Sequence, residues 1–515
     1  MIPYLSRVFK HFLHSRGRYD IIHTMKIWLI GHEYKYAVEQ MLLTLFPEER
    51  PEYPEKLPDG DRMEVSYRRN GPERSACCRL IIGGETFEGE DTAVLSDETN
   101  GLEENRTGQR LVKNAIYQAA LNSGVSKPPW GALTGVRPGK ILCRLLDEEK
   151  DREKARRRFE NEYDVSPERA ELCADTAYYT LEAASRLRQE DVCLYIGIPF
   201  CPTRCAYCSF VSQSVEKSMK LMGPFLEALE KEIRATASQV RRCGLRPVSV
   251  YFGGGTPTTL SGEQLDRLCT ELEEAFDLSA VQEYTVEAGR PDTITGDKLR
   301  ILKRHGVTRV SVNPQTMSDR ILEVIGRRHS AEDILAALEK VRSVGGFEVN
   351  MDLIAGLPED SVSGFEKTLR TVLELGPENI TVHTLSLKNG SRITLEKTRI
   401  PSGAEVAEML DLSRSLLREN GYGPYYLYRQ KFMSGGFENI GWTKPGSANL
   451  YNICIMEELC SILAMGGGGS TKLVKPGDTR NIRIMAPKYP LEYISSIGRI
   501  CEGKEKIERF YTAEV

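Results

Sequence analysis

Three cysteines, Cys201, Cys205 and Cys208, lie within a run of eight residues. Thiolates are the ligands of iron–sulfur clusters, and sulfurs this close in sequence can converge on one face of a cubane. Three ligands for four irons leave one iron open, and an open position on a metal site can bind and activate a small molecule. The spacing therefore predicts a [4Fe–4S] cluster. A zinc site is the alternative, but it needs a fourth ligand, and neither a paired CxxC nor a nearby histidine supplies one.

A glycine-rich run, YFGGGTPT, occupies residues 251–258. Glycines let the backbone approach a ligand closely, and their N–H groups can meet a carboxylate. Taken alone, the run is equally consistent with a tight turn. Its place at the end of the strand that follows the cysteines favours ligand binding.

Polar residues stand at or near the ends of three further apolar runs, at Glu287, Gln315 and Asp352. Carboxylates suit ribose hydroxyls and an ammonium group, because they accept hydrogen bonds from both. A strand-end acid can also cap the next helix. The ordered recurrence of these residues favours binding over capping.

The elements that must position these residues alternate along the middle of the chain. Six short apolar runs predict strands, and helical patterns lie between them, as at 224–238, 263–276 and 332–344. Six strand–helix units predict a parallel sheet with right-handed crossovers. About 200 residues are too few for the roughly 250 of a closed eight-unit barrel, so we expect an open, partial barrel with its chemistry at the carboxyl ends of the strands. The predicted strands are 193–198, 248–252, 281–287, 307–312, 347–354 and 379–385.

The regions on either side of this barrel differ in pattern. Strand-like runs at 26–31, 63–68 and 76–82 and helical patterns at 32–46 and 104–122 predict a small α+β domain at 25–125. A charged helical linker follows at 126–190, the partial barrel spans 191–400, and a mostly helical C-terminal domain covers 401–515. The first 24 residues precede a second plausible start at Met25, and we interpret them as an extension outside the fold.

Composition and charge narrow the class of protein. Hydrophobic residues at 40% and charged residues at 28% are typical of a soluble globular protein. The net charge of −4 gives no overall attraction to nucleic acid or anionic membrane, so an acidic substrate needs a local basic pocket. No apolar run approaches the roughly 20 residues that span a bilayer, and the N-terminus does not resemble a secretory signal. We therefore expect a cytoplasmic protein with no membrane span and no nucleic-acid partner.

The 13 cysteines of the chain favour metal binding or catalysis over disulfides in a reducing cytosol. The cysteines outside the loop are scattered in sequence, and we interpret them as small buried hydrophobic residues. These are Cys77, Cys78, Cys143, Cys173, Cys193, Cys243, Cys269, Cys454, Cys460 and Cys501.

The CxxxCxYC spacing resembles the signature of the radical SAM superfamily, whose fold is a partial (β/α)6 barrel. The runs LYIGIPFC at 194–201, GGGTPT at 253–258, VEA at 286–288, QT at 315–316 and IGRRH at 325–329 resemble the oxygen-independent coproporphyrinogen III oxidase family. The runs LTGVRP at 133–138 and NPQT at 313–316 are similar to the HemZ-type coproporphyrinogen dehydrogenases. The resemblance extends over nearly all residues after Met25.

The resemblance implies a [4Fe–4S] cluster and S-adenosylmethionine (SAM), which chelates the open iron and is cleaved to a radical. It implies that Tyr195 contacts SAM and that Gly254 and Glu287 bind the SAM on the cluster. Residues that match a second SAM site of the oxidase are Gly255, Thr256, Gln315, Arg327 and Asp352. Tyr207 stands among these cofactor-contacting positions where the oxidase has phenylalanine, which leaves the occupancy of the second site open. The N-terminal arm of the oxidase has no counterpart that we can identify.

The implied reaction is the oxidative decarboxylation of coproporphyrinogen III to protoporphyrinogen IX in haem biosynthesis. Hydrogen is removed from the β-carbon of a propionate, and loss of carbon dioxide and an electron leaves a vinyl group. The implied partners are the tetrapyrrole substrate and an external electron donor such as flavodoxin or ferredoxin.

The four carboxylates of this substrate require basic side chains at the site. Arginine suits this role, because a guanidinium group binds a carboxylate through two hydrogen bonds. The candidates are Arg290, Arg309, Arg328, Arg392, Arg429, Lys388 and Lys431. Surface solvation is the commoner role for any one of them. Tyr425, Tyr426 and Tyr428 are equally consistent with packing on a flat macrocycle and with filling the domain junction.

Three alternative functions remain at this stage. Haem chaperones on the same fold carry an HNxxYW motif in the tail, where this chain has YNICIM at residues 451–456, with tyrosine replacing the histidine and no tryptophan. A radical SAM protein that opens or methylates haem would share the barrel residues. A zinc-stabilised RNA-modifying protein would need a dense basic patch, which the sequence lacks.

Overall fold

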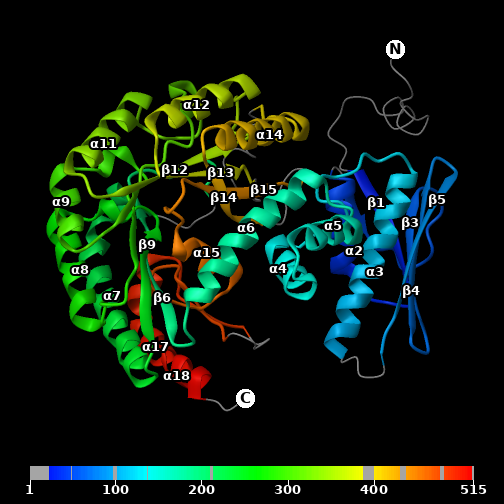
Figure 1. Ribbon diagram of the computed structural model, residues 1–515, viewed down its shortest axis with the longest axis horizontal. Coiled ribbons are helices and arrows are strands. Elements are labelled where there is room, and N and C mark those ends of the chain that lie inside the picture. The colour runs from blue at the N-terminus through cyan, green and yellow to red at the C-terminus, as the bar shows by residue number, and fades with distance from the viewer. Residues whose placement is uncertain are drawn as a thin grey trace. The chain divides into compact units, whose positions relative to one another are not determined.

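The computed structural model describes residues 23–47, 49–96, 101–135, 137–208, 213–386, 399–429, 436–475 and 481–512 (Figure 1). The chain forms two compact units. The smaller unit comprises Met1–Val136, Leu145–Glu171 and Ser434–Gly436, and the larger comprises Arg137–Arg144, Leu172–Met433 and Phe437–Val515. Residues 1–22 of the predicted N-terminal extension lie outside the described residues, and the first strand begins at His23.

The smaller unit contains the predicted N-terminal α+β fold. Its five-stranded sheet has the order β2-β1-β3-β4-β5, in which β3, β4 and β5 form an antiparallel meander and β1 runs parallel to both of its neighbours. Sequence patterns missed β2 and β5. The elements are β1 (His23–Ile30), α2 (Lys35–Leu45), β2 (Glu49–Glu52), β3 (Arg62–Asn70), β4 (Glu73–Ile82), β5 (Glu85–Val94) and α3 (Gly101–Asn122).

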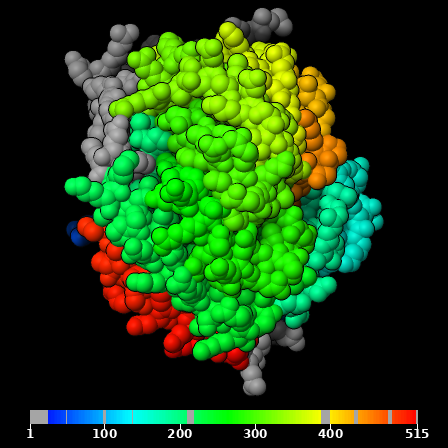
Figure 2. All heavy atoms as spheres, turned by 90° about the vertical axis from the view of Figure 1, so that its left-hand side faces the viewer, coloured from blue at the N-terminus to red at the C-terminus, as the bar shows by residue number. Residues whose placement is uncertain are grey.

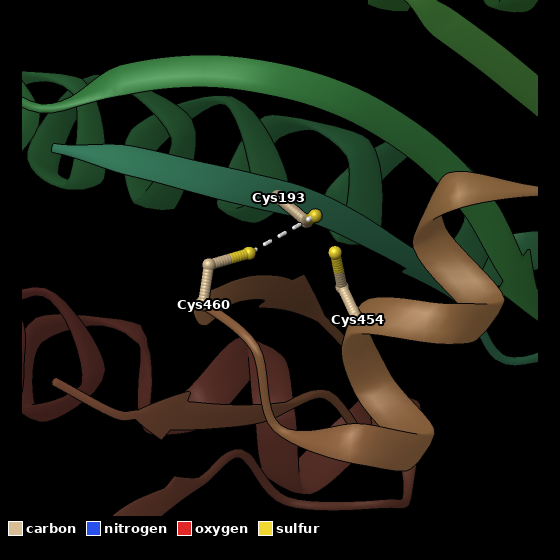
Figure 3. Close-up of side chains that lie close together, drawn as sticks. All are labelled: Cys193, Cys454 and Cys460. Carbon is tan, nitrogen blue, oxygen red and sulfur yellow. Dashed lines mark hydrogen bonds between the residues drawn. The ribbon is translucent and has the colours of Figure 1, made fainter. Parts of the chain in front are cut away.

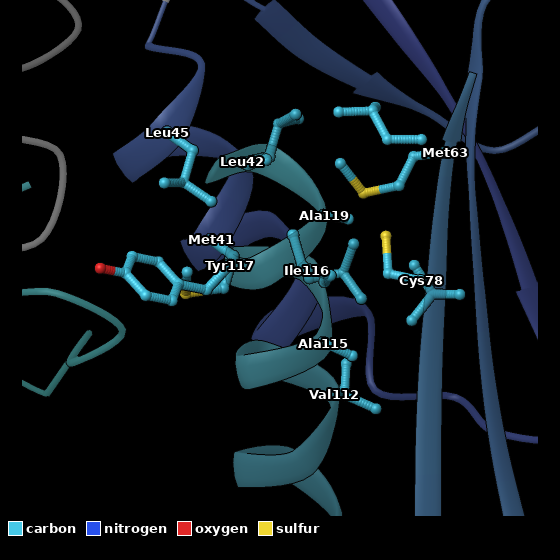
Figure 4. Packing of buried hydrophobic residues seen from close by; sticks show 14 of the residues in the cluster. Met41, Leu42, Leu45, Met63, Cys78, Val112, Ala115, Ile116, Tyr117 and Ala119 are labelled. Carbon is cyan, nitrogen blue, oxygen red and sulfur yellow. The ribbon is translucent and has the colours of Figure 1, made fainter. Parts of the chain in front are cut away.

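The core of this unit lies between the sheet and its two helices. Val112, Ile116 and Ala119 recur at helical spacing along α3 and are fully buried. They meet Met41 and Leu42 of α2 and side chains from the strands (Figure 4). This cluster is a complete hydrophobic core that belongs to the smaller unit alone.

The charged stretch predicted as a helical linker is helical over most of its length. It contains α4 (Pro138–Glu149), α5 (Arg152–Tyr163) and α6 (Pro167–Arg186). The side chain of Asp151 caps α5 by accepting a hydrogen bond from the backbone N–H of Lys154.

The larger unit is built on the six predicted parallel strands, which follow one another in chain order across the sheet. Their residues are almost continuously buried, as parallel strands covered on both faces require. The predicted α/β class and partial barrel are confirmed, and among the described strands the two sheet edges do not pair with each other. The six strands are β6 (Asp191–Ile198), β9 (Arg246–Gly254), β10 (Glu283–Glu287), β11 (Arg309–Ser311), β12 (Glu348–Ala355) and β13 (Asn379–Thr384).

The crossover helices cover the outside of this sheet (Figure 1). Ser261 and Ser330 form capping boxes that start α8 and α11 at the predicted positions. Side chains of these helices, in green, form the face shown in Figure 2, with the C-terminal helices in red along its lower side. The helices are α7 (Val215–Arg242), α8 (Gly262–Ala275), α9 (Gly296–Arg304), α10 (Asp319–Val324), α11 (Ala331–Val344) and α12 (Val362–Leu375), with short turns η1 (Pro257–Thr259) and η2 (Pro291–Thr293).

The C-terminal residues extend this sheet at both edges. β15 pairs antiparallel with β13, and β16 pairs parallel with β6, so the sheet reaches 11 strands. A short pair, β7 (Phe200–Cys201) and β8 (Gln213–Ser214), stands apart from it. The C-terminal elements are α14 (Gly403–Glu419), β14 (Gly423–Arg429), β15 (Glu438–Thr443), α15 (Leu450–Glu457), β16 (Ser461–Gly466), β17 (Ser470–Leu473), β18 (Ile482–Met485), α16 (Pro490–Ser495), α17 (Ile497–Gly503) and α18 (Glu505–Thr512).

Candidate functional site

The carboxyl ends of β6 and β9 bring the cysteine loop and the glycine-rich run together. The backbone N–H of Gly255 donates to the carbonyl of Ile198 over 2.7 Å, and that of Thr256 donates to Phe200 over 2.7 Å. A Cβ at position 255 would lie 2.4 Å from the Phe200 oxygen, so this close approach requires glycine. The two motifs therefore form one edge of a single site.

The loop cysteines are partly exposed and receive polar contacts from this edge. The Thr256 hydroxyl donates to Sγ of Cys201 over 3.5 Å. The buried guanidinium of Arg290 lies 3.7 Å from Sγ of Cys205 and also donates to the Thr203 hydroxyl over 2.9 Å.

The three loop sulfurs are spaced more widely than the ligands of one metal ion. Among the described residues, the His, Cys, Asp and Glu ligand atoms that gather within 4.8 Å of one another come from Cys193, Cys454 and Cys460 instead. Ligands of a cubane bind different irons, so they stand farther apart than ligands of a single ion. The spacing in the loop therefore suits a cluster better than the alternative zinc ion.

Glu287 ends β10 with a carboxyl that protein groups largely enclose. The Tyr251 hydroxyl donates to its Oε1 over 2.6 Å, and the backbone N–H of Gly254 donates to it as well. Burial raises the pKa of Glu287 to about 7, and the charge of Asp352 adds to this increase, whereas the two hydrogen bonds oppose it. A cationic group such as an ammonium bound here would favour the ionised carboxylate.

Three tyrosine rings stack beside Glu287. The Tyr251 and Tyr451 ring centroids are 4.3 Å apart, and Tyr195 lies 6.2 Å from Tyr251 and 6.1 Å from Tyr451. A Cβ at Gly253 would come within 3.2 Å of Glu287 Oε1 and within 3.1 Å of the Tyr195 ring, so glycine keeps this space open. We refer to Tyr195, Tyr251 and Tyr451 as the tyrosine stack.

Arg327 approaches the cysteine loop from the segment after α10. Its buried guanidinium donates to the carbonyl of Asn313 over 2.6 Å and to the hydroxyl of Tyr207 over 3.2 Å. Neighbouring His329 is buried with neither ring nitrogen hydrogen-bonded among the described residues. Burial and the charges of Arg327 and Arg290 lower the pKa of His329 to about 3, so the ring is neutral. Unpartnered buried polar atoms at this edge are consistent with a site that binds a polar ligand.

Gln315, which follows β11, lies beside Asp352 in the second half of β12. Gln315 has a φ of +66°, in the left-handed region, and its N–H donates to the carbonyl of Asp352 over 2.8 Å. The Asp352 carboxyl accepts a hydrogen bond from the Asn350 amide over 2.8 Å. A strained residue held by its neighbours is typical of ligand sites.

The basic residues proposed for the substrate separate into two groups. Arg309 starts β11 at the opposite end of the strands from the cysteines and forms a buried ion pair with Glu283 and a more exposed one with Glu348. Arg429 is also buried, and burial lowers its pKa to about 10. Arg309 and Arg429 are therefore structural residues of the interior. In contrast, Arg290 lies at the cysteine loop and Arg328 is exposed beside Arg327. Lys388, Arg392 and Lys431 lie outside the described residues.

Tyr425 and Tyr426 agree with the second interpretation, in which these rings fill the interior instead of packing on a macrocycle. Both are buried, and the Tyr426 ring packs over Gly441, where a Cβ would lie 1.9 Å from the ring. The Tyr425 hydroxyl accepts a hydrogen bond from Asn452 over 3.0 Å. These rings fill the interior beneath α6 and α15, while Tyr428 lies next to them, partly exposed, at 6.4 Å from Tyr426.

Comparison with known sequences agrees with this arrangement of the barrel. The sequence model of the Radical SAM superfamily matches residues 195–372, which run from β6 through α12. An oxygen-independent coproporphyrinogen-III oxidase-like protein, HemZ of Bacillus subtilis strain 168, is 37% identical over 407 residues, which cover 77% of this chain and 81% of the relative.

Other relatives carry two different functional names. The haem chaperone HemW of Bacillus subtilis strain 168 is 33% identical and covers 59% of this chain and 76% of its own length. The oxygen-independent coproporphyrinogen III oxidase of Salmonella typhimurium is 32% identical over 50% of this chain and 56% of its own. The solved coproporphyrinogen III oxidase HemN of Escherichia coli matches at a TM-score of 0.49 with 24% identity, over 63% of this chain and 72% of that one.

This chain therefore belongs to the radical SAM superfamily, within the family of HemZ-type proteins that resemble the oxygen-independent coproporphyrinogen III oxidases. Membership brings a [4Fe–4S] cluster and SAM as cofactors. None of the described helices is long and apolar enough to cross a membrane.

Sequence patterns missed two residues of the tyrosine stack, Tyr251 and Tyr451. Tyr251 stands two residues before Gly253, so strand alternation places it on the same face of β9 as that glycine. This alternation in the sequence could therefore have identified Tyr251 as a site residue. Tyr451 comes from α15, about 200 residues along the chain, and only the fold brings it to the site.

Proposed function

We propose that this chain is a radical SAM oxidoreductase that converts coproporphyrinogen III into protoporphyrinogen IX by oxygen-independent oxidative decarboxylation. The observation that carries the proposal is the match to the oxidase-like HemZ, which spans 81% of that relative at 37% identity. The matches to the HemW and Salmonella proteins span 76% and 56% of those relatives.

In this proposal, Cys201, Cys205 and Cys208 would hold the cluster and leave it an open position for SAM. When bound, the cluster and SAM supply one-electron chemistry that removes a hydrogen atom from the substrate. Gly254 and Glu287 hold the SAM amino group, which suits a carboxylate already fixed by the Tyr251 hydroxyl at 2.6 Å. Tyr195 lies against the same ligand.

A second SAM would contact Gly255, Thr256, Gln315, Arg327 and Asp352. The structure gives Arg327 a hydrogen bond to Tyr207 at 3.2 Å, which a phenylalanine could not make. Tyr207 therefore competes with a second ligand for this guanidinium.

The substrate loses hydrogen from the β-carbon of a propionate, and its carboxylate leaves as carbon dioxide. One electron passes to an external acceptor, the side chain becomes a vinyl group, and a second round repeats the steps on another propionate. Among the basic candidates in the part of the chain that the structure describes, Arg328 is proposed to meet a substrate carboxylate, because it is exposed next to Arg327. We further propose flavodoxin or ferredoxin as the electron donor and the cytoplasm as the compartment.

The haem chaperone is the second candidate, because two thirds or more of HemW aligns with this chain. Tyr451 stands where the chaperone motif has its histidine. Its ring is buried in the tyrosine stack, where it faces Tyr251 at 4.3 Å rather than solvent. A buried tyrosine at this position favours the enzyme over haem delivery.

Anaerobic turnover tests the proposal. The reconstituted enzyme receives SAM, a reductant and coproporphyrinogen III, and chromatography follows protoporphyrinogen IX and 5′-deoxyadenosine. We expect two decarboxylations for each product molecule, and neither product with a Cys205→Ala variant. Formation of 5′-deoxyadenosine without decarboxylation would refute the oxidase but not SAM cleavage, and stable haem binding with transfer would instead support the chaperone.

A further inference from the structure

Three cysteines far from the 201–208 loop in sequence meet inside the larger unit. Cys193 lies on β6, Cys454 on α15, and Cys460 immediately before β16, and their sulfurs point toward one another (Figure 3). All three are buried, and their Sγ atoms lie within 4.8 Å of one another, with 3.6 Å between Cys193 and Cys460. We refer to them as the cysteine triad. Sequence patterns predicted each as an isolated hydrophobic residue.

The spacing of the triad is that of ligands to one ion. Metal–sulfur bonds of about 2.3 Å place neighbouring sulfurs roughly 3.8 to 4.0 Å apart in tetrahedral or trigonal sites. The distances in the triad, 3.6 Å for one pair and at most 4.8 Å for the others, bracket that value. A disulfide needs about 2.05 Å between sulfurs, so these three are free thiols.

The donor set defines the class of ion. Sulfur ligands select soft ions such as Zn²⁺ and Cu⁺ and reject Mg²⁺ and Ca²⁺. Val248, Tyr451 and Ile462 pack around the triad.

A cavity lies next to the hydrophobic cluster that encloses the triad. A space of about 350 Å³ at the amino ends of the barrel strands is lined by Leu187 and Leu450, which also pack against the triad. The carboxylates of Glu182, Glu283 and Glu348 line the same cavity, next to Arg186 and Arg309.

From this geometry we propose that Cys193, Cys454 and Cys460 form a second metal site, which holds one thiophilic closed-shell ion. Cys454 follows Tyr451 by one helical turn, and Cys193 precedes Tyr195 by two residues on the same face of β6. An ion at the triad therefore fixes α15 against β6 and with it the tyrosine stack that contacts Glu287.

The test uses the full chain with Cys201, Cys205 and Cys208 each replaced by serine, which removes the loop ligands and leaves the triad intact. Zn²⁺ and Cu⁺ are titrated separately under anaerobic conditions against chromophoric chelators, and elemental analysis counts the bound metal. Co²⁺ serves as a spectroscopic probe of thiolate ligation. We expect one tightly bound equivalent and thiolate-to-cobalt charge-transfer absorption, and the tighter of the two ions identifies the occupant.

A further Cys454→Ser substitution should weaken binding by at least about a hundredfold. Cys269→Ser is the matched control, because Cys269 is equally buried but bonds to Tyr284 instead of to other cysteines, and it should leave binding unchanged. If Cys454→Ser fails to fold, metal binding by the triple loop variant still tests the proposal. Absence of stoichiometric metal in that variant, a disulfide within the triad, or full affinity after Cys454→Ser would each overturn the proposal.

Discussion

We propose that Glu287 is the ionisable side chain on which SAM binding depends most. Its carboxyl bonds the Tyr251 hydroxyl at 2.6 Å, and burial raises its pKa to about 7. Near neutral pH it therefore exchanges between a neutral form and the carboxylate that attracts an ammonium group.

We expect the affinity for SAM to rise as pH increases through 7. A carboxyl with a pKa near 7 is mostly neutral at pH 6 and mostly ionised at pH 8, so affinity should increase about tenfold between them. Equilibrium binding to the cluster-loaded enzyme measures this. Glu287→Gln should bind weakly with no such dependence, and Glu348→Gln, at the other end of the barrel, should keep it. A dependence that survives in Glu287→Gln would contradict the assignment.

The hydroxyl of Tyr207 gives a second prediction at this scale. Its bond to Arg327 is 3.2 Å long and involves a buried charge, so it is worth roughly 1.5–3 kcal/mol. Tyr207→Phe should release the guanidinium and tighten binding of a second SAM equivalent by about tenfold. Isothermal titration of the cluster-loaded enzyme counts the equivalents. The double variant with Arg327→Ala should lose the gain, and a gain that persists there would rule out this explanation.

Residue types and spacing singled out the cysteine loop, the glycines and Glu287, because each stands at or just after the end of an apolar run, and their roles toward the cluster and SAM stay predictions. They did not distinguish Arg309 from Arg290, since both are arginines beside strands. Only the fold shows that Arg309 starts its strand while Arg290 follows the end of β10. Sequence patterns did not reveal the cysteine triad either, because its members come from three separate elements that only the fold brings together.

Helix α15 contacts both Glu283 and the tyrosine stack. The Glu283 carboxyl accepts the backbone N–H groups of Leu450 and Tyr451 over 2.9 and 3.3 Å at the helix start. A carboxylate at a helix N-terminus satisfies free donors and opposes the helix dipole. Tyr451 and Cys454 on the same helix then reach the tyrosine stack and the triad.

We expect Glu283→Gln to loosen this helix. The change removes the carboxylate charge that faces the first N–H groups of α15 and weakens a buried ion pair with Arg309 at 3.4 Å, while Arg309 keeps Glu348 as a partner. Hydrogen exchange should speed up at the amides of 450–457. Glu348→Gln changes a more exposed partner of the same arginine and should have a smaller effect there. Equal protection of α15 in both variants would show that Glu283 does not anchor it.

Elements of the barrel were predictable because buried parallel strands form unbroken apolar runs. The predicted strands match β6 and β9 to β13 to within a few residues. The strands β14 to β18 were missed, since the tail lacks that pattern, and β5 was missed because charged residues alternate through it.

At the scale of the whole molecule, the two units differ in what they contain. Every residue assigned here to the cluster or to SAM lies in the larger unit, and the smaller unit has its own core. This division predicts that damage to the smaller core leaves the chemistry of the site intact.

Ile116→Ala tests that independence. The side chain is fully buried in the smaller core, and its truncation should cost about 2–5 kcal/mol. Thermal unfolding should show a lowered transition for the smaller unit, while SAM cleavage at 25 °C stays near the unmodified rate. Ser75→Ala, on a more exposed part of the same sheet, serves as the control. Loss of SAM cleavage in folded Ile116→Ala would mean that the smaller unit supports the site directly.

The central claim is that this protein takes hydrogen from the propionate β-carbon of coproporphyrinogen III. Coproporphyrinogen III deuterated at those carbons, supplied anaerobically with SAM and a reductant, tests it most directly by mass spectrometry of the nucleoside product. The account predicts 5′-deoxyadenosine that carries one deuterium, together with protoporphyrinogen IX. Unlabelled 5′-deoxyadenosine and unchanged substrate would contradict it.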